Sequence, residues 1–183
     1  RCVIIVASAA EKETPSTEGM QRSVATSPFL THRAEAVAEP RLLDLQKAFR
    51  QRNFERFGEL TMRDSNSFHA TCLDTFPPIF YLNEVSKRAI TCVHAFNAAQ
   101  KRTRAAYTFD AGPNAVVFCE NEAAADAFAA LAATCFLGAD LSRRGLRGLT
   151  NAPEKLARAC RANPPSDALL EACGDKRGGA TMM

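Results

Sequence analysis

The sequence predicts an α+β domain in which helices pack on one face of a small, mainly antiparallel sheet. Helical patterns outnumber β-prone runs along the 183 residues, and strands and helices do not alternate regularly as they do in parallel α/β sheets. The clearest β-signal is a pair of short β-prone runs joined by a tight Gly-Pro bend. This length suits one domain with a sizeable core better than two independent domains.

The first quarter of the chain predicts a strand followed by a broken helix. The apolar run Cys2 to Ala7 indicates a buried strand, and the polar stretch Ser8 to Thr17 indicates a loop. A helix should follow, with Ser16 and Thr17 as plausible caps. Pro28 is expected to bend or break that helix.

Three longer helical patterns come next. From Pro40 onward, apolar residues between Leu42 and Phe49 recur at i, i+3 and i+4 spacing, which predicts an amphipathic helix. A second pattern runs from Phe54 to Cys72 and ends before Pro77-Pro78. A third covers Ile79 to Ala99.

The pattern changes at Ala105. The runs Ala105 to Asp110 and Asn114 to Cys119 are β-prone and are joined by Ala111-Gly112-Pro113, which predicts a strand, tight turn, strand unit. The remaining elements are an alanine-rich helix capped by Asn121 and ending near Thr134, a Gly/Arg-rich loop over Gly138 to Gly148, and weaker helices over Pro153 to Ala162 and Asp167 to Cys173.

Composition excludes several classes of protein. With 46% hydrophobic and 23% charged residues, the chain is expected to fold as a globular protein. Its 23 basic residues are interspersed with 20 acidic ones, and the net charge of +3 is too mild to indicate a nucleic-acid partner. The apolar run near the start is far shorter than the roughly 20 residues of a membrane span, and it lacks the features of a signal peptide. No membrane partner is expected.

The cysteine pattern indicates reduced thiols. The number is odd, and no CxxC pair occurs, so packing residues in a cytoplasmic protein are the simplest explanation. The seven are Cys2, Cys72, Cys92, Cys119, Cys135, Cys160 and Cys173.

The sharpest candidate for chemistry is Asp110. It stands at the end of a predicted strand, just before a turn made by Gly112 and fixed by Pro113, so rigid backbone should hold its carboxylate off the sheet edge. Such placement suits a catalytic group. An aspartate here could equally cap the turn with its side chain, and spacing alone leaves both interpretations open.

A second candidate lies in the segment Pro15 to Met20. Two hydroxyls and a glycine mark an expected helix start, where free backbone N–H groups and the helix dipole can bind a phosphate or carboxylate. An ordinary N-cap is the alternative.

A third stretch, Asp64 to Pro78, places Ser65 and His69 four residues apart on one helix face. A Cys/His nucleophile pair with Cys72 is rejected because no orienting third group is evident, and a buried, hydrogen-bonded histidine is the preferred interpretation. No metal site is predicted, since the three histidines (His32, His69 and His94) lack ligand spacing.

Together these stretches resemble the C-terminal region of diphosphomevalonate decarboxylases, which belong to the small-molecule kinase superfamily of galactokinase, homoserine kinase and mevalonate kinase. The resemblance implies the ferredoxin-like C-terminal lobe of that superfamily, and it fades beyond Cys119. It runs in order through Ser16 to Met20, Ser23 to Pro28, Asp64 to Pro78, Ser86 to Arg88 and Tyr107 to Val116.

The resemblance implies a reaction and its participants. Family members use ATP, with Mg2+, to phosphorylate the tertiary 3-hydroxyl of mevalonate 5-diphosphate, then release phosphate and CO2 to give isopentenyl diphosphate. Asp110 matches the aspartate beside that hydroxyl, acting as general base or as electrostatic partner of the developing cation. Ser16, Thr17, Gly19 and Met20 match the segment that contacts the substrate. The resemblance also implies a cytoplasmic homodimer.

Residues 1–183 are expected to form a single C-terminal decarboxylase domain, cut at both ends from a longer protein whose ATP-binding N-terminal lobe is absent. Arg1 leads straight into a strand, and Gly178 to Met183 resembles a strand beginning. The isolated chain is therefore expected to be inactive. Two alternatives stay open: a related kinase acting on mevalonate or a mevalonate phosphate, and a non-catalytic lobe kept for dimerisation or regulation. The Asp110 turn and the run Ser67 to Thr71 favour the decarboxylase.

Overall fold

A computed structural model describes residues 1–8, 13–137 and 153–174. Helices dominate, and the strands form one small antiparallel sheet, so the predicted α+β class is confirmed. The predicted Gly/Arg-rich loop over Gly138 to Gly148 and the tail from Gly178 to Met183 lie outside the described residues.

The sheet has three strands in the order β1-β3-β2, with β1 at Cys2–Ile5, β2 at Ala105–Phe109 and β3 at Ala115–Cys119. Both pairings are antiparallel. The strand predicted over Cys2 to Ala7 is present but is not buried as expected, because Ile4 keeps 61% of its surface exposed. The reason is position: within the described ranges β1 pairs with β3 alone and lies at the edge of the sheet.

The helical region after β1 begins differently from the prediction. Helix α1 spans Ser16–Thr26, and its N-cap is Pro15, which provides no side-chain hydrogen bond. The predicted caps Ser16 and Thr17 instead lie in the first turn. Ser27 caps the next helix, since its hydroxyl accepts a hydrogen bond from the Leu30 amide at 3.3 Å.

The predicted break at Pro28 is confirmed, because α1 ends at Thr26 and α2 begins at Pro28. A π-helical segment follows directly and leads into α3, so the helix predicted from Pro40 is the last part of a longer helical run. The bounds are Pro28–His32 for α2, Arg33–Ala38 for η1 and Glu39–Arg50 for α3.

Helix α4 spans Phe54–Asp74 and lies close to β2. A Cβ atom added at Gly58 would stand 2.8 Å from the Thr103 side chain and 3.1 Å from Ala106 Cβ, so only glycine permits this approach. Helix α5 spans Glu84–Ala99, five residues shorter at its start than predicted.

The late start of α5 has a local cause. Asn83 accepts a hydrogen bond from the Ser86 amide at 3.0 Å, and the Ser86 hydroxyl accepts one from the Asn83 amide at 3.3 Å. This reciprocal capping box fixes the first turn of the helix. The residues 79–83 that precede it are not helical.

Three further helices complete the fold: α6 at Glu122–Leu137, α7 at Pro153–Ala162 and α8 at Asp167–Ala172. Asn121 caps α6 as predicted, since its side chain accepts a hydrogen bond from the Ala124 amide at 2.9 Å. Among the described residues, none of the helices combines the length and apolar character that crossing a membrane requires.

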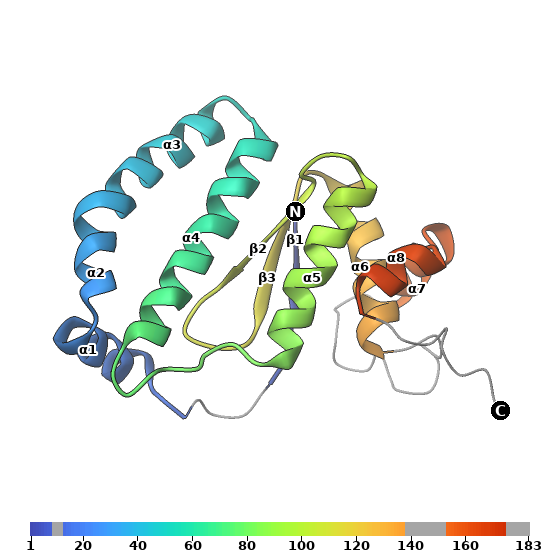
Figure 1. The fold of residues 1–183 in the computed structure, drawn as a ribbon. Coiled ribbons are helices and arrows are strands. Elements are labelled where there is room, and N and C mark those ends of the chain that lie inside the picture. The colour runs from blue at the N-terminus through green and yellow to red at the C-terminus, as the bar shows by residue number, and fades with distance from the viewer. Residues whose placement is uncertain (9–12, 138–152, 175–183) are drawn as a thin grey trace.

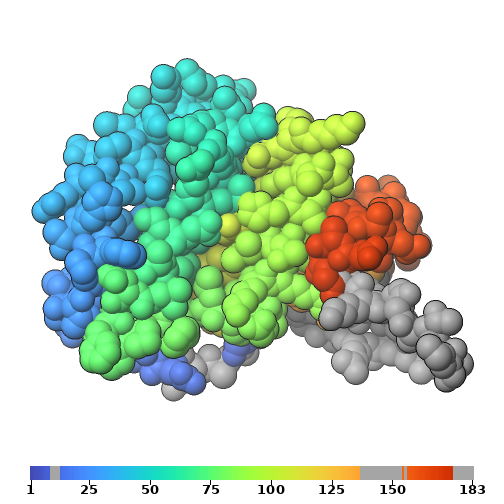
Figure 2. All heavy atoms as spheres, viewed as in Figure 1, coloured from blue at the N-terminus to red at the C-terminus, as the bar shows by residue number. Residues whose placement is uncertain are grey.

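The core lies where α5 and α6 meet the sheet, and its largest fully buried side chains include Tyr107, Phe128 and Leu131. In Figure 1, α4 runs beside the strands and α5 crosses in front of them, whereas α7 and α8 lie beyond α6. Figure 2 shows that α4 and α5 leave little of the sheet visible from this side. The turn between β2 and β3 emerges at one end of this arrangement.

Candidate functional site

Asp110 is the first residue of the connection between β2 and β3. The strands end in the pair Phe109 and Ala115, so residues 110–114 form a five-residue loop. The Gly112 amide donates to the Asp110 carbonyl at 2.8 Å, which makes the loop turn tightly, and Gly112 itself is buried. The Asp110 side chain is exposed at the tip, as the sequence predicted for a carboxylate held off the sheet edge.

Two helices anchor this turn through serine hydroxyls. The buried Ser65 of α4 accepts a hydrogen bond from the Phe109 amide at 3.1 Å. Ser86 of α5 is fully buried and donates to the Pro113 carbonyl at 2.8 Å. The residue before Asp110 and the residue three places after it are therefore each tied to a separate helix.

Asn114 ties the turn to the segment that follows β1. Its side-chain oxygen accepts hydrogen bonds from the amides of Ala7 at 2.8 Å and Ser8 at 3.2 Å. Because three elements far apart in sequence hold the loop, the position of Asp110 depends on tertiary structure and not on the turn alone.

Asp110 lines a hollow of about 300 Å³. Its wall combines the turn with the adjoining ends of the strands and is lined by Ser8, Thr108, Phe109, Asp110, Gly112, Pro113, Asn114 and Val116. Such a space is large enough for part of a small-molecule substrate.

Three of the four predicted substrate-contact residues (Ser16, Gly19 and Met20) line a second hollow of about 300 Å³. Thr17 is exposed and lines neither hollow. The second hollow reaches Ala111, the residue after Asp110, so the two hollows are lined by neighbouring residues of the same turn. The structure thus places the predicted substrate segment and Asp110 beside hollows that adjoin the same turn.

Gly19 permits a close approach, and the group that approaches it is Tyr81. A Cβ atom at residue 19 would overlap the Tyr81 hydroxyl. That hydroxyl is buried and has no hydrogen-bond partner among the described residues. In this structure glycine at position 19 is therefore needed for packing of α1 against the chain around Tyr81.

Arg33 supplies a cation to the wall of the second hollow. It pairs with Asp64 at 2.9 Å, and Arg41 pairs with the same carboxylate at 3.2 Å. Burial acts to raise the pKa of Asp64, but the hydrogen bonds and charges of the two arginines outweigh it, and the pKa lies below its ordinary value. A second guanidinium nitrogen of Arg33 is buried without a partner among the described residues.

His69 and Cys72 do not form a nucleophile pair. Burial lowers the pKa of His69, although a hydrogen bond with the Phe109 backbone and the nearby charge of Asp110 oppose that shift. Burial also raises the pKa of the Cys72 thiol to about 11, which keeps it protonated at neutral pH. The structure confirms that His69 is buried, but only in part that it is hydrogen-bonded: it interacts with the Phe109 backbone, whereas its Nε2 atom is buried without a partner among the described residues.

Sequence reasoning did not find the anchoring residues Ser65, Ser86 and Asn114. Ser65 was noted only as a neighbour of His69 on one helix face. The Asn83-to-Ser86 spacing is a capping-box signal that could have located the start of α5, but no local pattern reports a contact with Pro113.

The family of the chain follows from comparison with known proteins. The sequence model described as "Mevalonate 5-diphosphate decarboxylase C-terminal domain" matches residues 2–169. The chain belongs to this family. The match covers every residue of the Asp110 turn and its three anchors.

Individual members of the decarboxylase family are also similar to the chain. A diphosphomevalonate decarboxylase of Bos taurus is 56% identical over 131 residues, which make up 72% of this chain and 33% of the relative. A crystal structure of a mevalonate 5-diphosphate decarboxylase superposes with a TM-score of 0.72 at 39% identity, covering 95% of this chain and 44% of that one. The chain thus spans less than half the length of these relatives.

A third similarity is to a solved structure named "MDDEF in complex with MVAPP, AMPPCP and Magnesium". It is 31% identical, has a TM-score of 0.57, and covers 63% of this chain and 35% of that one. ATP and Mg2+ use is therefore supported for the family.

The described residues of this chain do not fit the phosphates of ATP. A phosphate-cradling loop needs glycines with open backbone N–H groups at a helix start. Gly19 packs against Tyr81, Gly58 packs against Thr103, and Gly112 is buried in the Asp110 turn. The fourth glycine of the described residues, Gly174, has open space around it but follows the C-terminal end of α8, so it does not lie at a helix start.

Proposed function

We propose that this chain provides the catalytic aspartate of an ATP-dependent decarboxylase that converts mevalonate 5-diphosphate to isopentenyl diphosphate. The observation that carries the proposal is the exposed carboxylate of Asp110, held over a hollow by hydrogen bonds from α4, α5 and the segment after β1. Membership of the decarboxylase family supports the choice of reaction.

The chemistry explains why a rigid carboxylate is needed. A tertiary alcohol is a weak nucleophile and hydroxide is a poor leaving group, so the hydroxyl must first become a phosphate ester. Loss of phosphate then builds positive charge at the tertiary carbon as the neighbouring carboxylate of the substrate leaves as CO2. A fixed anion such as Asp110 can orient the hydroxyl, accept its proton, or stabilise that charge.

The substrate segment of the proposal consists of Ser16, Thr17, Gly19 and Met20. Ser16, Gly19 and Met20 line the second hollow, whose wall is mainly apolar and also includes Arg33. ATP and Mg2+ are proposed to bind mainly to parts of the enzyme outside this chain. The homodimer and the cytoplasmic location implied by the resemblance stay predictions.

The test is the variant Asp110→Asn in the full-length enzyme, assayed for ATP-dependent CO2 release. We expect turnover to fall by several orders of magnitude, far more than the loss of a turn cap would cause. Asp44→Asn is the matched control, because Asp44 is an exposed carboxylate that pairs with Arg56 on the surface at 3.1 Å. Equal activity of the two variants would contradict the proposal.

Product analysis separates the decarboxylase from a related kinase. A kinase would accumulate a phosphorylated acid and release no CO2, whereas the proposed enzyme forms one CO2 for each ADP. A non-catalytic lobe would show neither product in any full-length form.

A further inference from the structure

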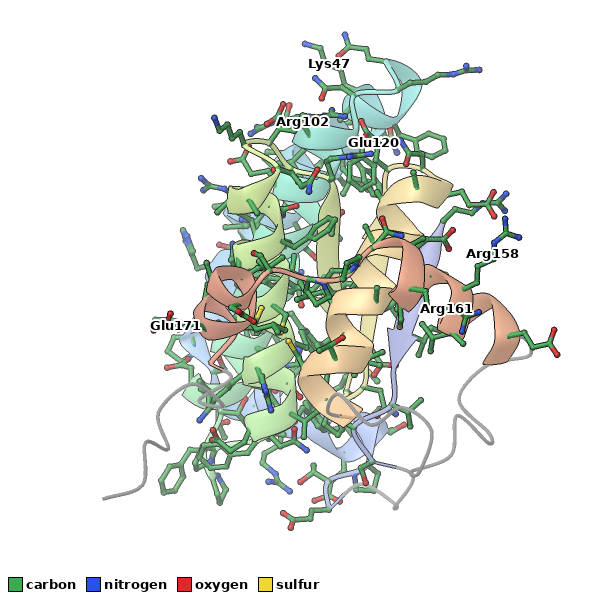
Figure 3. All side chains as sticks on the ribbon, turned by 90° about the vertical axis from the view of Figure 1, so that its right-hand side faces the viewer. Lys47, Arg102, Glu120, Arg158, Arg161 and Glu171 are labelled. Atoms are coloured by element: carbon green, nitrogen blue, oxygen red, sulfur yellow. The ribbon has the colours of Figure 1, made fainter. Side chains whose placement is uncertain are left out.

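Three cysteines that are far apart in sequence meet in the core. Cys92 comes from α5, Cys135 from α6, and Cys173 from the C-cap of α8. Their sulfur atoms all lie within 4.8 Å of one another. Their side chains are almost completely buried, with exposed fractions of 0%, 5% and 1%. In Figure 3 sulfur atoms, drawn in yellow, lie where α5 and α6 face each other, close to the helix that carries Glu171.

A cation stands beside this cysteine cluster. Arg88 precedes Cys92 by one turn of α5, and its guanidinium lies 5.5 Å from the centre of the Phe136 ring, next in sequence to Cys135. Its charge acts to lower the pKa of Cys173. Its Nε atom is buried and has no hydrogen-bond partner among the described residues. A buried donor without a partner is costly, so an anionic group in the cluster would stabilise it.

The three thiols are close enough to hydrogen-bond to one another. Hydrogen bonds with the other two thiols, together with burial, raise the pKa of Cys92. The hydrogen bond with Cys135 has the largest effect on Cys173, and its pKa rises to about 12. Three sulfurs at this spacing can share one metal cation.

We propose that Cys92, Cys135 and Cys173 together bind one Zn2+ ion as thiolate ligands. Binding displaces one proton from each thiol, so three protons are released for each ion bound. The three thiolates and Zn2+ carry a net charge of −1, which the charge of Arg88 balances. A water molecule completes the tetrahedron, since Zn2+ in proteins is almost always four-coordinate when its ligands are thiolates.

The geometry fits this ion. With Zn–S bonds of about 2.3 Å, two sulfurs on tetrahedral zinc lie about 3.8 Å apart. The sulfurs here lie within 4.8 Å of one another, so they need to close by no more than about 1 Å. A soft three-sulfur site selects a thiophilic ion over Mg2+ or Ca2+, which prefer oxygen ligands.

The ion would join three helices that are otherwise held by apolar packing. Helix α8 is short and contacts α5 through residues such as Leu169 and Leu170. A bond from Cys173 to a metal shared with Cys92 and Cys135 would fix α8 on the α5 and α6 pair. None of the three cysteines lines the hollow beside Asp110, and the proposal does not depend on the proposed reaction.

The proposal is tested on the 183-residue chain with Zn2+ itself as the probe. We expect elemental analysis of protein purified with a non-chelating reductant to give one zinc per chain. After chelation, addition of Co2+ should produce a thiolate-to-cobalt charge-transfer band. Each of Cys92→Ser, Cys135→Ser and Cys173→Ser should lower the Zn2+ affinity by about 100-fold or more, since each removes one of three thiolate bonds.

Cys119→Ser is the matched control, because Cys119 is a buried thiol at 2% exposure outside the cluster. It should bind Zn2+ as the wild type does. A wild-type chain without stoichiometric zinc and without the charge-transfer band would overturn the proposal. So would a Cys119→Ser variant that loses as much affinity as the cluster variants.

A further measurement needs no variant and therefore cannot fail through misfolding. Wild-type protein is alkylated with and without Zn2+, and modified cysteines are located by mass spectrometry. Protection of Cys92, Cys135 and Cys173 by Zn2+ supports the site. Unchanged alkylation, or a disulfide between two of these cysteines in zinc-free and zinc-treated protein alike, overturns it.

Discussion

The hydroxyl of Ser86 links the start of α5 to the Asp110 turn, and its removal should measurably destabilise the domain. Ser86→Ala removes two hydrogen bonds of the Ser86 hydroxyl. One is donated to the Pro113 carbonyl at 2.8 Å, and the other is accepted from the Asn83 amide at 3.3 Å as part of the capping box. Each such bond contributes about 1 kcal/mol net. Alanine has the higher helix propensity and offsets about 0.5 kcal/mol. We expect the free energy of unfolding to fall by about 1–3 kcal/mol.

The assay is urea denaturation of the 183-residue chain, followed by circular dichroism. Thr91→Ala is the matched control, because Thr91 lies on the same helix and its exposed hydroxyl donates only to the Lys87 carbonyl at 3.1 Å. Its effect should be below about 0.5 kcal/mol. If Ser86→Ala and Thr91→Ala lowered the unfolding free energy equally, Ser86 would not be an anchor of the turn. In the full-length enzyme, Ser86→Ala should also lower kcat for CO2 release, and Thr91→Ala should not.

Three further predictions follow from the site and its surroundings. Burial lowers the pKa of His69 from its ordinary value of 6.5, so the unfolded chain binds a proton at a higher pH than the folded chain does. The unfolding free energy of the wild type should therefore decline as the pH falls below about 6.5. In His69→Gln the unfolding free energy should change less with pH. If urea denaturation gave the same pH dependence for both proteins, His69 would not be the cause. Burial raises the pKa of Cys72 to about 11, so iodoacetamide at about pH 8 should modify the exposed Cys2 and leave Cys72 intact. Peptide mapping measures both modifications, and rapid modification of Cys72 in folded protein would contradict its burial. The isolated 183-residue chain should release neither ADP nor CO2 from ATP and mevalonate 5-diphosphate, and steady turnover would refute the assignment of the ATP site to residues outside it.

Local sequence signals predicted the elements that carry their own pattern. The α4 helix and the hairpin around Asp110 were predicted because apolar periodicity and a Gly-Pro bend are visible within a few residues. The extra helical residues assigned before Glu84 show the limit of that approach. Apolar side chains at Ile79 and Leu82 fit a helix, but the capping box that begins at Asn83 sets the true start.

The remaining features of the fold and the site depend on contacts between residues far apart in sequence, and a pattern within a short segment does not report such contacts. The exposure of β1 follows from its place at the sheet edge, which its composition does not reveal. The site shows the same contrast: Asp110 was identified from its turn and from resemblance, whereas its anchors Ser65 and Ser86 act across 44 and 27 residues of sequence. The cysteine cluster was hidden for the same reason, since Cys92, Cys135 and Cys173 show no ligand spacing along the chain.

The pairing of β1 with β3 constrains the order of events during synthesis on the ribosome. The Arg1 amino group bonds to Cys119 across 118 residues, and the Ala7 amide bonds to Asn114 across 107. A nascent chain can form α1 to α5 early, because helices need only nearby residues, but β1 must wait until β3 has emerged. The contact of Asn114 with the segment after β1, which helps to hold the loop bearing Asp110, therefore forms only once the chain has been synthesised beyond residue 114.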